Sequence, residues 1–453
     1  MNDLLVNAAE RAGHYLETIG ERGVAPTANA LADLDRFNEP LQDRPCDPQT
    51  VLATLDEIGS PATMGVAGPR FFGFVIGGSL PVALAANWLA GAWDQNAGLY
   101  ATSPVAARLE EVALGWLLEA LGLPPESGAG FVTGATMANF TALAAARHAI
   151  LQKVGWDVEA NGLFGAPLIT VIVGEEAHTT LFKALGMLGL GRNRVVKVPV
   201  DSQGRMLAEK IPAISGPTII CVQGGNVNTG AFDPVEQICE KAHAAGAWVH
   251  VDGAFGLWAA VSPGRAHLVA GVEKADSWAT DAHKWLNVPY DSGLAFCRDR
   301  EALRSAMSVS AAYLPEGQRR EPSNFTPELS RRARGVEVWA VLRALGREGL
   351  AELIERNCQA ATRFAVGLKE AGYEILNEVV LNQVLVKFGD AETTLRVIKV
   401  IQEDGTCWAG GTVWQGHTAM RISVSSWATT ESDVECSLEA ILKIASMLKQ
   451  PLV

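Results

Sequence analysis

Hydrophobic and polar positions follow different patterns along the chain. Residues 1–65 carry apolar positions at helical spacing, broken near Pro26 and again in a proline- and aspartate-rich link at about 40–48. We expect an N-terminal helical arm there. From about 68 to 300, short β-branched runs alternate with alanine- and leucine-rich helical stretches. Such alternation is typical of βαβ units with a mostly parallel sheet, so the predicted fold class is α/β.

Individual strands and helices of this central region can be placed from the same pattern. The expected strands are Leu168–Val173, Val195–Val200, Thr218–Val222, Ala247–Val251, Ser277–Thr280 and Gly293–Cys297. The expected helices are Pro104–Leu121, Met137–Val154, Thr179–Leu188 and Pro234–Ala245. In open α/β sheets ligands bind outside the carboxyl ends of the parallel strands, so the loops that follow these strands are the first place to look for chemistry.

The remainder of the chain is organised differently. Residues 300–330 are polar and contain several prolines, which indicates a mobile loop, and an amphipathic helix should follow at roughly Ser330–Leu345. An α+β part should end the chain, with strands at Asn382–Phe388 and Ala419–Val424 and helices at Ala391–Asp404 and Glu431–Lys449. The expected divisions are an arm at 1–65, a large domain at 66–305, a mobile active-site loop at 306–330 and a small C-terminal domain at 331–453.

Composition and charge narrow the class of protein. The chain is 48% hydrophobic and 19% charged, which is an ordinary globular composition. Its formal net charge of −13 argues against basic-patch binding to nucleic acid or to an anionic membrane. The charged N-terminal segment lacks a signal-peptide core, and no run of about 18 apolar residues occurs. The seven cysteines show no C-x-x-C spacing, so we expect a reducing, cytoplasmic location and no metal site.

The densest chemical signal is an aspartate and a lysine that each end an apolar segment. Asp252 lies in H-V-D-G-A-F-G, and Lys284 lies in S-W-A-T-D-A-H-K-W-L-N-V-P-Y-D-S-G. Pyridoxal 5′-phosphate (PLP) needs both groups. A desolvated lysine forms an imine with its aldehyde, and a carboxylate keeps its pyridine nitrogen protonated, so that the ring withdraws electrons from the substrate Cα. The alternative is a surface lysine after a turn and an aspartate that caps a helix.

Three further loops follow predicted strands or apolar runs. Residues 130–139, G-F-V-T-G-A-T-M-A-N, run through small residues into a predicted helix. The N-terminus of that helix would attract a phosphate. His178, in E-A-H-T-T, could lie flat on an aromatic cofactor, and residues 224–233, G-G-N-V-N-T-G-A-F-D, offer amide and hydroxyl donors. Each has a plain alternative: a helix cap, a capping or core histidine, and a polar turn. Their occurrence together, in order, favours a cofactor site.

These motifs resemble those of the group II PLP-dependent amino-acid decarboxylases, which include glutamate, aromatic-amino-acid, histidine and diaminobutyrate decarboxylases. D-A-H-K-W with P-Y-D-S-G after it, and N-V-N-T-G-A-F-D-P, carry the resemblance, which covers about residues 65–440. It implies fold type I of the PLP enzymes (aspartate-aminotransferase-like), with a seven-stranded, mostly parallel sheet in the large PLP-binding domain. It also implies an amino-acid substrate and a homodimer with its active site at the subunit interface.

The resemblance implies roles for single residues. Lys284 resembles the Schiff-base lysine, Asp252 the partner of the pyridine nitrogen, and His178 the residue stacked on the ring and able to donate a proton. The implied cofactor contacts are Ala135, Thr136, His178, Asn226, Asp252, Ala254, His283 and Lys284. The implied substrate contacts are Arg421, Phe74 and Tyr100, of which Arg421 resembles an arginine for the α-carboxylate.

One departure from the family bears on the reaction. Many members carry a mobile-loop tyrosine that protonates Cα after carbon dioxide leaves; here Phe325 lies near that place, and Tyr313 is the tyrosine nearby. Decarboxylation of an L-amino acid to its amine, through a quinonoid intermediate, is the leading expectation. The alternatives are oxidation to an aldehyde or transamination, a C–C lyase of the sphingosine-phosphate-lyase type, and a PLP-binding protein without turnover.

Overall fold

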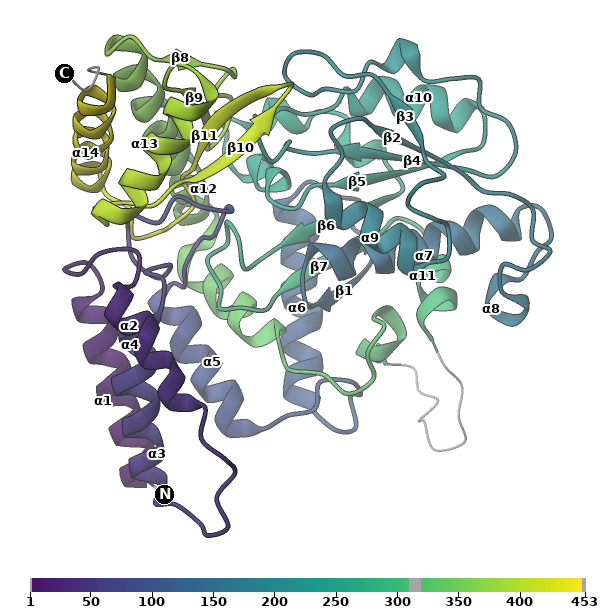
Figure 1. Ribbon diagram of the computed structural model, residues 1–453. Coiled ribbons are helices and arrows are strands. Elements are labelled where there is room, and N and C mark those ends of the chain that lie inside the picture. The colour runs from purple at the N-terminus through teal and green to yellow at the C-terminus, as the bar shows by residue number, and fades with distance from the viewer. Residues whose placement is uncertain (1, 309–318, 450–453) are drawn as a thin grey trace. The chain divides into compact units, whose positions relative to one another are not determined.

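The computed structural model describes residues 2–308 and 319–449, which form two compact units (Figure 1). The first unit comprises Ser79–Gln359 and Asn377–Gln383, and the second comprises Met1–Gly78, Ala360–Leu376 and Val384–Val453. The N-terminal helices therefore belong to the same compact unit as the C-terminal α+β part. The functional divisions expected at 1–65, 66–305, 306–330 and 331–453 stay predictions.

A seven-stranded sheet forms the centre of the first unit, in the order β1-β7-β6-β5-β4-β2-β3. The strands are β1 (Gly128–Val132), β2 (Thr170–Gly174), β3 (Val196–Val198), β4 (Thr218–Gln223), β5 (Trp248–Asp252), β6 (Ser277–Asp281) and β7 (Gly293–Cys297). The pairs β6–β5, β5–β4, β4–β2 and β2–β3 are parallel, whereas β7 is antiparallel to both of its neighbours. The predicted α/β class with a mostly parallel, seven-stranded sheet is confirmed.

Helices cover this sheet. Because the strands are buried beneath them, their sequences are continuous apolar runs. Every residue of β4, β5, β6 and β7 is buried, as expected for strands covered on both faces. The long α7 lies across the sheet and packs against β5, β6 and β7 (Figure 1). The helices of the unit before the loop are α5 (Pro81–Trp93), α6 (Pro104–Ala120), α7 (Ala135–Gln152), α8 (Val158–Asn161), α9 (Thr179–Met187), α10 (Val235–Ala244) and α11 (Arg300–Met307).

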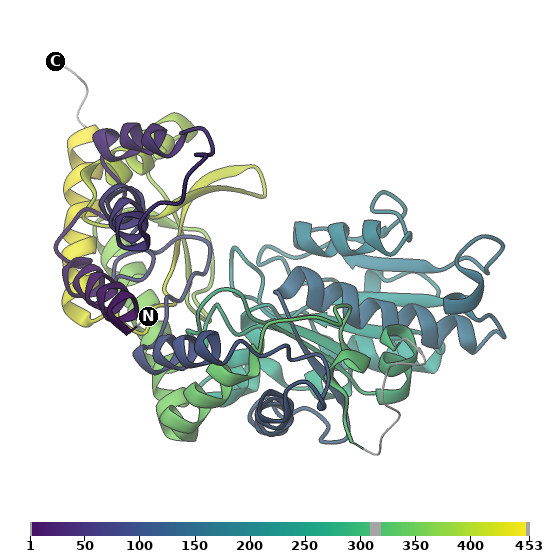
Figure 2. The ribbon, with the colours of Figure 1, turned by 90° about the horizontal axis from the view of Figure 1, so that it is seen from below.

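The second unit contains a four-stranded sheet in the order β10-β11-β9-β8. Its strands are β8 (Glu374–Ile375), β9 (Gln383–Lys387), β10 (Gly410–Trp414) and β11 (His417–Ser423). Helix α13 (Ala391–Asp404) packs on β11 and on α14 (Glu431–Lys449), the yellow helix in Figure 2. The N-terminal helices of this unit are α1 (Asn2–Thr18), α2 (Ala28–Ala32), α3 (Pro48–Thr54) and α4 (Ser60–Ala62).

Helix α12 (Gly335–Glu370) supplies residues to both units and differs from the expected Ser330–Leu345. It begins five residues later, and a break at Gly346 (φ 59°, ψ −168°) separates its first segment from a second that continues to Glu370. Glycine adopts this left-handed backbone without a Cβ clash. The helix that was expected to end at Leu345 therefore bends at Gly346 and continues. No helix among the described residues is long and apolar enough to cross a membrane.

Strand β1 was not predicted, and its glycines explain why. Its sequence, G-A-G-F-V, has little of the β-branched or aromatic character that marks a strand. A Cβ at Gly130 would lie 2.6 Å from the carbonyl oxygen of Phe325. Close packing against this segment, and not strand propensity, therefore explains why position 130 is a glycine.

Candidate active site

The loops expected to carry the chemistry meet at one edge of the first unit's sheet. Strands β2, β4, β5 and β6 run parallel, and β1 shares their direction because β1 and β6 are both antiparallel to β7. Their carboxyl ends therefore lie along the same edge. His178 follows β2, Asn226 follows β4, Asp252 ends β5, Lys284 follows β6, and Ala135 follows β1.

Asp281, which the sequence analysis did not single out, holds Lys284 in place. The Lys284 Nζ lies 3.0 Å from Asp281 Oδ2, and Asp281 Oδ1 accepts the backbone N–H of Ala135 at 2.6 Å. The Lys284 side chain is 20% exposed and that of Asp281 only 3%. The lysine amine is thus fixed beside the first residue of α7, at the expected phosphate cradle. The donor expected for the phosphate at Ala135 is here hydrogen-bonded to Asp281.

Asp252 is a buried carboxylate with protein donors on both oxygens. Its Oδ2 accepts from Asn139 Nδ2 at 3.0 Å, and its Oδ1 accepts from the backbone N–H of Ala254 at 3.3 Å. Hydrogen bonds of this kind stabilise a charged carboxylate in a buried place. Burial first, and then the negative charge of Asp252, raise the pKa of the neighbouring Cys221 thiol. Asp252 is therefore held in one orientation at the end of β5.

His283 presents an N–H toward the same corner of the site. Its Nδ1 accepts the backbone N–H of Ser292 at 3.0 Å, and its Nε2 lies 3.6 Å from Asp281 Oδ1. Burial lowers the pKa of His283 although Asp281 acts against this, so the ring is neutral at pH 7 with its proton on Nε2. The ring of Tyr290 lies against the imidazole at a tilt of 31°, with ring centroids 4.3 Å apart. A Cβ at Gly134 would lie 3.1 Å from His283 Cε1, so a small residue is needed there.

Asn226 provides a direct test of whether the site fits PLP. Its Oδ1 accepts the backbone N–H groups of Asn228 (2.9 Å) and Thr229 (3.2 Å), while its Nδ2 is buried without a partner among the described residues. A buried donor left unpaired costs about 1–3 kcal/mol, which a ligand acceptor would recover. An amine at Lys284 after β6, a carboxylate at Asp252 on β5 and an unused amide donor at Asn226 after β4 follow one another in the sheet order. These three groups fit the aldehyde, ring nitrogen and ring oxygen of PLP.

His178 caps helix α9, as its plain alternative proposed. Its Nδ1 accepts the backbone N–H of Thr180 at 3.3 Å and lies 2.7 Å from the Thr180 hydroxyl. The histidine is half-buried at the carboxyl end of β2. Capping does not compete with a role over the cofactor ring, because these contacts fix the orientation of the imidazole. The role of His178 over the cofactor ring stays a prediction.

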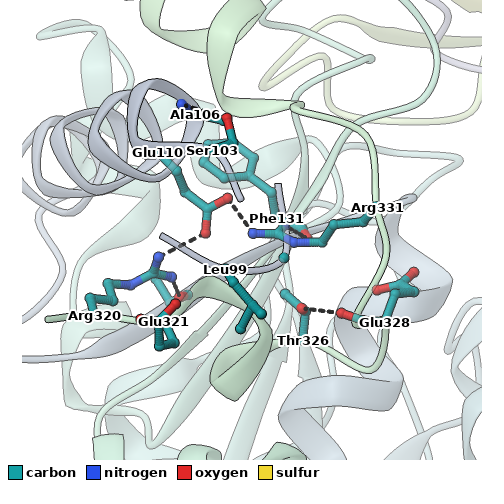
Figure 3. A network of polar contacts seen from close by, with 12 residues as sticks. Leu99, Ser103, Ala106, Glu110, Phe131, Arg320, Glu321, Thr326, Glu328 and Arg331 are labelled. Carbon is teal, nitrogen blue, oxygen red and sulfur yellow. Dashed lines mark hydrogen bonds and ion pairs between the residues drawn. The ribbon is translucent and has the colours of Figure 1, made fainter. Parts of the chain in front are cut away.

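A buried ion-pair network holds residues 320–331, which include the last part of the loop expected at 306–330 (Figure 3). Glu110 of α6 has a side chain only 2% exposed; its Oε1 lies 2.8 Å from Arg320 Nη1, and its Oε2 contacts Arg331. Arg320 also donates to the carbonyl of Ala129 (2.7 Å), and Arg331 to that of Phe131 (2.9 Å). The two arginines thereby join residues 320–331 to α6 and β1.

The residue near the place expected for the loop tyrosine is buried and does not lie at a mobile tip. Phe325 is 3% exposed, and the guanidinium groups of Arg300 and Arg320 lie 5.2 and 4.7 Å from its ring centroid. It packs in the hydrophobic core rather than at the surface. Tyr313 lies outside the described residues. Tyr100 is half-buried, with its backbone N–H donating to Glu321 Oε2 at 2.7 Å.

Two of the expected substrate contacts belong to the second unit. Arg421 lies on β11, opposite Gly410 of β10, and burial lowers the pKa of its guanidinium. Phe74 has a left-handed backbone (φ 54°) and stacks on Trp408 with ring centroids 5.5 Å apart. Their roles toward the substrate stay predictions.

Comparisons with known proteins give the family. The chain is 27% identical to tryptophan decarboxylase 1 of Oryza sativa subsp. japonica, over 97% of this chain and 92% of that protein. It is 24% identical to an aromatic-L-amino-acid decarboxylase of Bacillus atrophaeus (99% and 96% covered) and 25% identical to the phenylacetaldehyde synthase of Arabidopsis thaliana (89% and 88% covered).

Solved structures agree on the fold. The crystal structure of Oryza sativa TDC with PLP and tryptamine superposes with a TM-score of 0.92 at 22% identity, covering 99% of this chain and 98% of that one. Mouse CSAD gives a TM-score of 0.88 at 22% identity, with 100% and 99% covered. Residues 32–388 match the conserved-domain model of the pyridoxal-dependent decarboxylases. The chain therefore belongs to the pyridoxal-dependent decarboxylases, carboxy-lyases that use PLP as their cofactor.

Proposed function

We propose that this enzyme decarboxylates an L-amino acid to the corresponding amine, with Lys284 as the residue that carries PLP. The observation that carries the proposal is the pairing of a held lysine with a buried carboxylate: Asp281 fixes Lys284 after β6, and Asn139 and Ala254 hold Asp252 at the end of β5. PLP, when bound, supplies an electron sink for the negative charge left on Cα when carbon dioxide departs.

The remaining residues of the site have tasks in binding and orientation. The Asp252 carboxylate holds a proton on the pyridine nitrogen, and the buried Nδ2 of Asn226 donates to the ring oxygen. The start of α7 at Ala135 and Thr136, together with His283 Nε2–H, binds the phosphate. His178 and Ala254 would contact the two faces of the bound ring.

The assignments for substrate recognition follow the family resemblance. Arg421 holds the α-carboxylate before it leaves, and Phe74 and Tyr100 contact the side chain of the amino acid. Aromatic contacts favour an apolar or aromatic side chain, and two relatives named above act on aromatic amino acids by their names. After carbon dioxide leaves, His178 delivers the proton to Cα, because its capped Nδ1 fixes the ring.

A second candidate reaction is oxidation of the substrate to an aldehyde. Phe325 carries no acidic proton, and a relative is an aldehyde synthase by name. In that reaction the amino acid, oxygen and water give the aldehyde, carbon dioxide, ammonia and hydrogen peroxide. A carbanion without a proton donor would favour this course.

One assay separates the two reactions. The holoenzyme is incubated with each common amino acid, aromatic ones first, and carbon dioxide, amine and peroxide are measured together. The proposal expects amine equal to carbon dioxide and no peroxide. Peroxide matching carbon dioxide mole for mole would establish the aldehyde reaction instead, and release of no carbon dioxide from any amino acid would refute both.

We also propose a two-fold homodimer. Helix α5 exposes large apolar side chains, with Val82, Trp88, Leu89 and Trp93 between 38% and 56% exposed. In the second unit α1 exposes Leu5 at 60%. Exposed apolar side chains gathered on one helix are typical of a surface that another subunit covers.

A further inference from the structure

A line of buried polar side chains runs away from Asp252 into the interior of the first unit. Asn139 Nδ2 lies 3.0 Å from Asp252 Oδ2, and Asn139 Oδ1 lies 2.8 Å from His250 Nε2. His250 Nδ1 lies 2.9 Å from Ser277 Oγ, which lies 2.9 Å from Trp248 Nε1. Asn139, His250 and Ser277 have no exposed surface. All of these contacts join side chains and are separate from the backbone hydrogen bonds of the sheet and of helix α7.

The local fold places these residues in line. Trp248, His250 and Asp252 occupy alternate positions of β5, so their side chains share one face of the strand. Ser277 of β6 is the register partner of His250, and Asn139 comes from α7, which packs on this part of the sheet (Figure 1). The line therefore combines two adjacent strands with the helix that begins at the expected phosphate cradle.

The direction of each hydrogen bond follows from the chemistry at the two ends. The Asp252 carboxylate only accepts, so Asn139 turns its Nδ2 toward it and its Oδ1 toward His250. His250 must then donate from Nε2. Burial lowers the pKa of His250 to about 3, although a backbone hydrogen bond with Ser277 acts the other way, so the ring is neutral. With the proton on Nε2, the Nδ1 of the neutral ring accepts from the Ser277 hydroxyl.

The far end agrees with this direction. An indole N–H only donates, so Trp248 donates to Ser277 Oγ. Every link thus donates toward Asp252: Trp248 to Ser277, Ser277 to His250, His250 to Asn139, and Asn139 to the carboxylate. The opposite tautomer of His250 would require the Asn139 amide to turn its oxygen toward the carboxylate. Hydrogen bonds aligned in one direction polarise one another, which strengthens the last donor.

We propose that Asn139, His250 and Ser277 are positioning residues that keep Asp252 ionised and oriented, so that it holds the proton on the cofactor's ring nitrogen. This inference rests on the proposed role of Asp252. Its physical basis is that a buried carboxylate is stabilised in its charged form by oriented donors. A purely structural network of the same residues would leave the protonation of the cofactor's ring nitrogen unchanged when one donor is removed.

The first test needs no cofactor and no variant. The apoprotein, labelled with nitrogen-15 at histidine, is studied by long-range proton–nitrogen correlation between pH 6 and 8. We expect His250 to be neutral, with its proton on Nε2, throughout this range. A proton on Nδ1, or a charged ring, would overturn the proposal whatever the enzyme's activity.

The second test uses the holoenzyme with the PLP ring nitrogen labelled. Asn139→Leu keeps the volume but removes the last donor, and Ser277→Ala removes a donor two links away; His267→Phe, an exposed histidine of the same unit, is the control. We expect Asn139→Leu to lower kcat on the order of tenfold to a hundredfold with KM little changed, and to shift the ring-nitrogen resonance toward the unprotonated position. Ser277→Ala should show a smaller change of both quantities in the same direction.

The control and the wild type separate the possible failures. His267→Phe should match the wild type. If Asn139→Leu binds PLP, stays folded and keeps a protonated ring nitrogen and a normal kcat, the positioning role is wrong. If Asn139→Leu does not fold, Ser277→Ala decides by the same criteria. A wild-type protein that carries PLP on a lysine other than Lys284 would instead refute the proposed function, while the His250 tautomer would still stand as a separate result.

Discussion

Glu110→Gln tests the buried network of Figure 3 most sharply. The substitution keeps the shape of the side chain and removes its charge, which leaves Arg331 (side chain 1% exposed) and Arg320 (12% exposed) without their carboxylate. Removing one partner of a buried ion pair costs about 3–5 kcal/mol. Both guanidinium groups keep a backbone carbonyl, of Ala129 or Phe131, so we expect the lower end, about 3 kcal/mol.

The next residue on the same helix is a matched control. Glu111 pairs with Arg108 at 2.7 Å, but their side chains are 52% and 69% exposed. Such an exposed pair contributes about 0–1 kcal/mol, so Glu111→Gln should change the free energy of unfolding little. Urea unfolding of both variants is compared at one protein and one PLP concentration, because ligand and partner subunits shift apparent stability. Equal losses, within about 0.5 kcal/mol, would refute the claim that burial gives the Glu110 network its strength.

Three further predictions concern the site and the assembly. Asp252→Asn should bind PLP but lose on the order of a thousandfold in kcat, measured by carbon dioxide release, because a neutral amide does not hold the ring proton; near-normal turnover would contradict the role. The folded pKa of His250, about 3, lies below the ordinary 6.5, so its contribution to stability is present above pH 6.5 and is lost as the pH falls toward 3. Asp252 reaches His250 only through Asn139, and burial keeps the Cys221 thiol of the neighbouring strand neutral, so neither reverses this sign. His250→Gln should therefore lose about 2 kcal/mol less unfolding free energy between pH 7.5 and pH 5 than the wild type does, and an identical loss would show that His250 does not titrate on unfolding. Trp88→Lys, on the exposed face of α5, should shift the protein from dimer to monomer in light scattering, whereas a wild type that is already an active monomer would contradict the proposed dimer.

Parallel strands were readable from the sequence because burial on both faces leaves a continuous apolar run. Strand β7 and helices α13 and α14 have the predicted bounds. Strands β4 and β6 are one residue longer at the carboxyl end, and β5 is shifted by one residue at both ends. Strand β1 was missed because contact with the segment at Phe325 requires glycine, which propensity counts against a strand. The pattern of apolar positions predicts buried strands well. It fails where contact with a residue distant in the sequence requires a particular residue type.

The candidate site, too, could be predicted only in part from the sequence. Lys284, Asp252, His178 and Asn226 could be named because each follows a strand at one edge of the sheet. Asp281 was within the motif D-A-H-K-W, yet nothing in the sequence says that its carboxylate joins the lysine to α7. Such pairings depend on which loops meet in space, and a single sequence without structure does not contain that information.

The residues that hold Asp252 (Asn139 and His250) could not be identified from the sequence for a related reason. Asn139 lies 113 residues before the carboxylate to which it donates. His250 is part of H-V-D-G-A-F-G, but its role depends on a helix and a neighbouring strand. Polar residues buried in apolar surroundings are the one available signal, and it does not identify their partners.

The identity of the cofactor-bearing lysine tests the central claim most directly. The holoenzyme is reduced with borohydride, digested, and its peptides are mapped by mass spectrometry, with Lys284→Ala treated in parallel. We predict a pyridoxyl group on Lys284 in the wild type and no covalent cofactor in the variant. A pyridoxyl group on any other lysine of the wild-type chain would contradict the account.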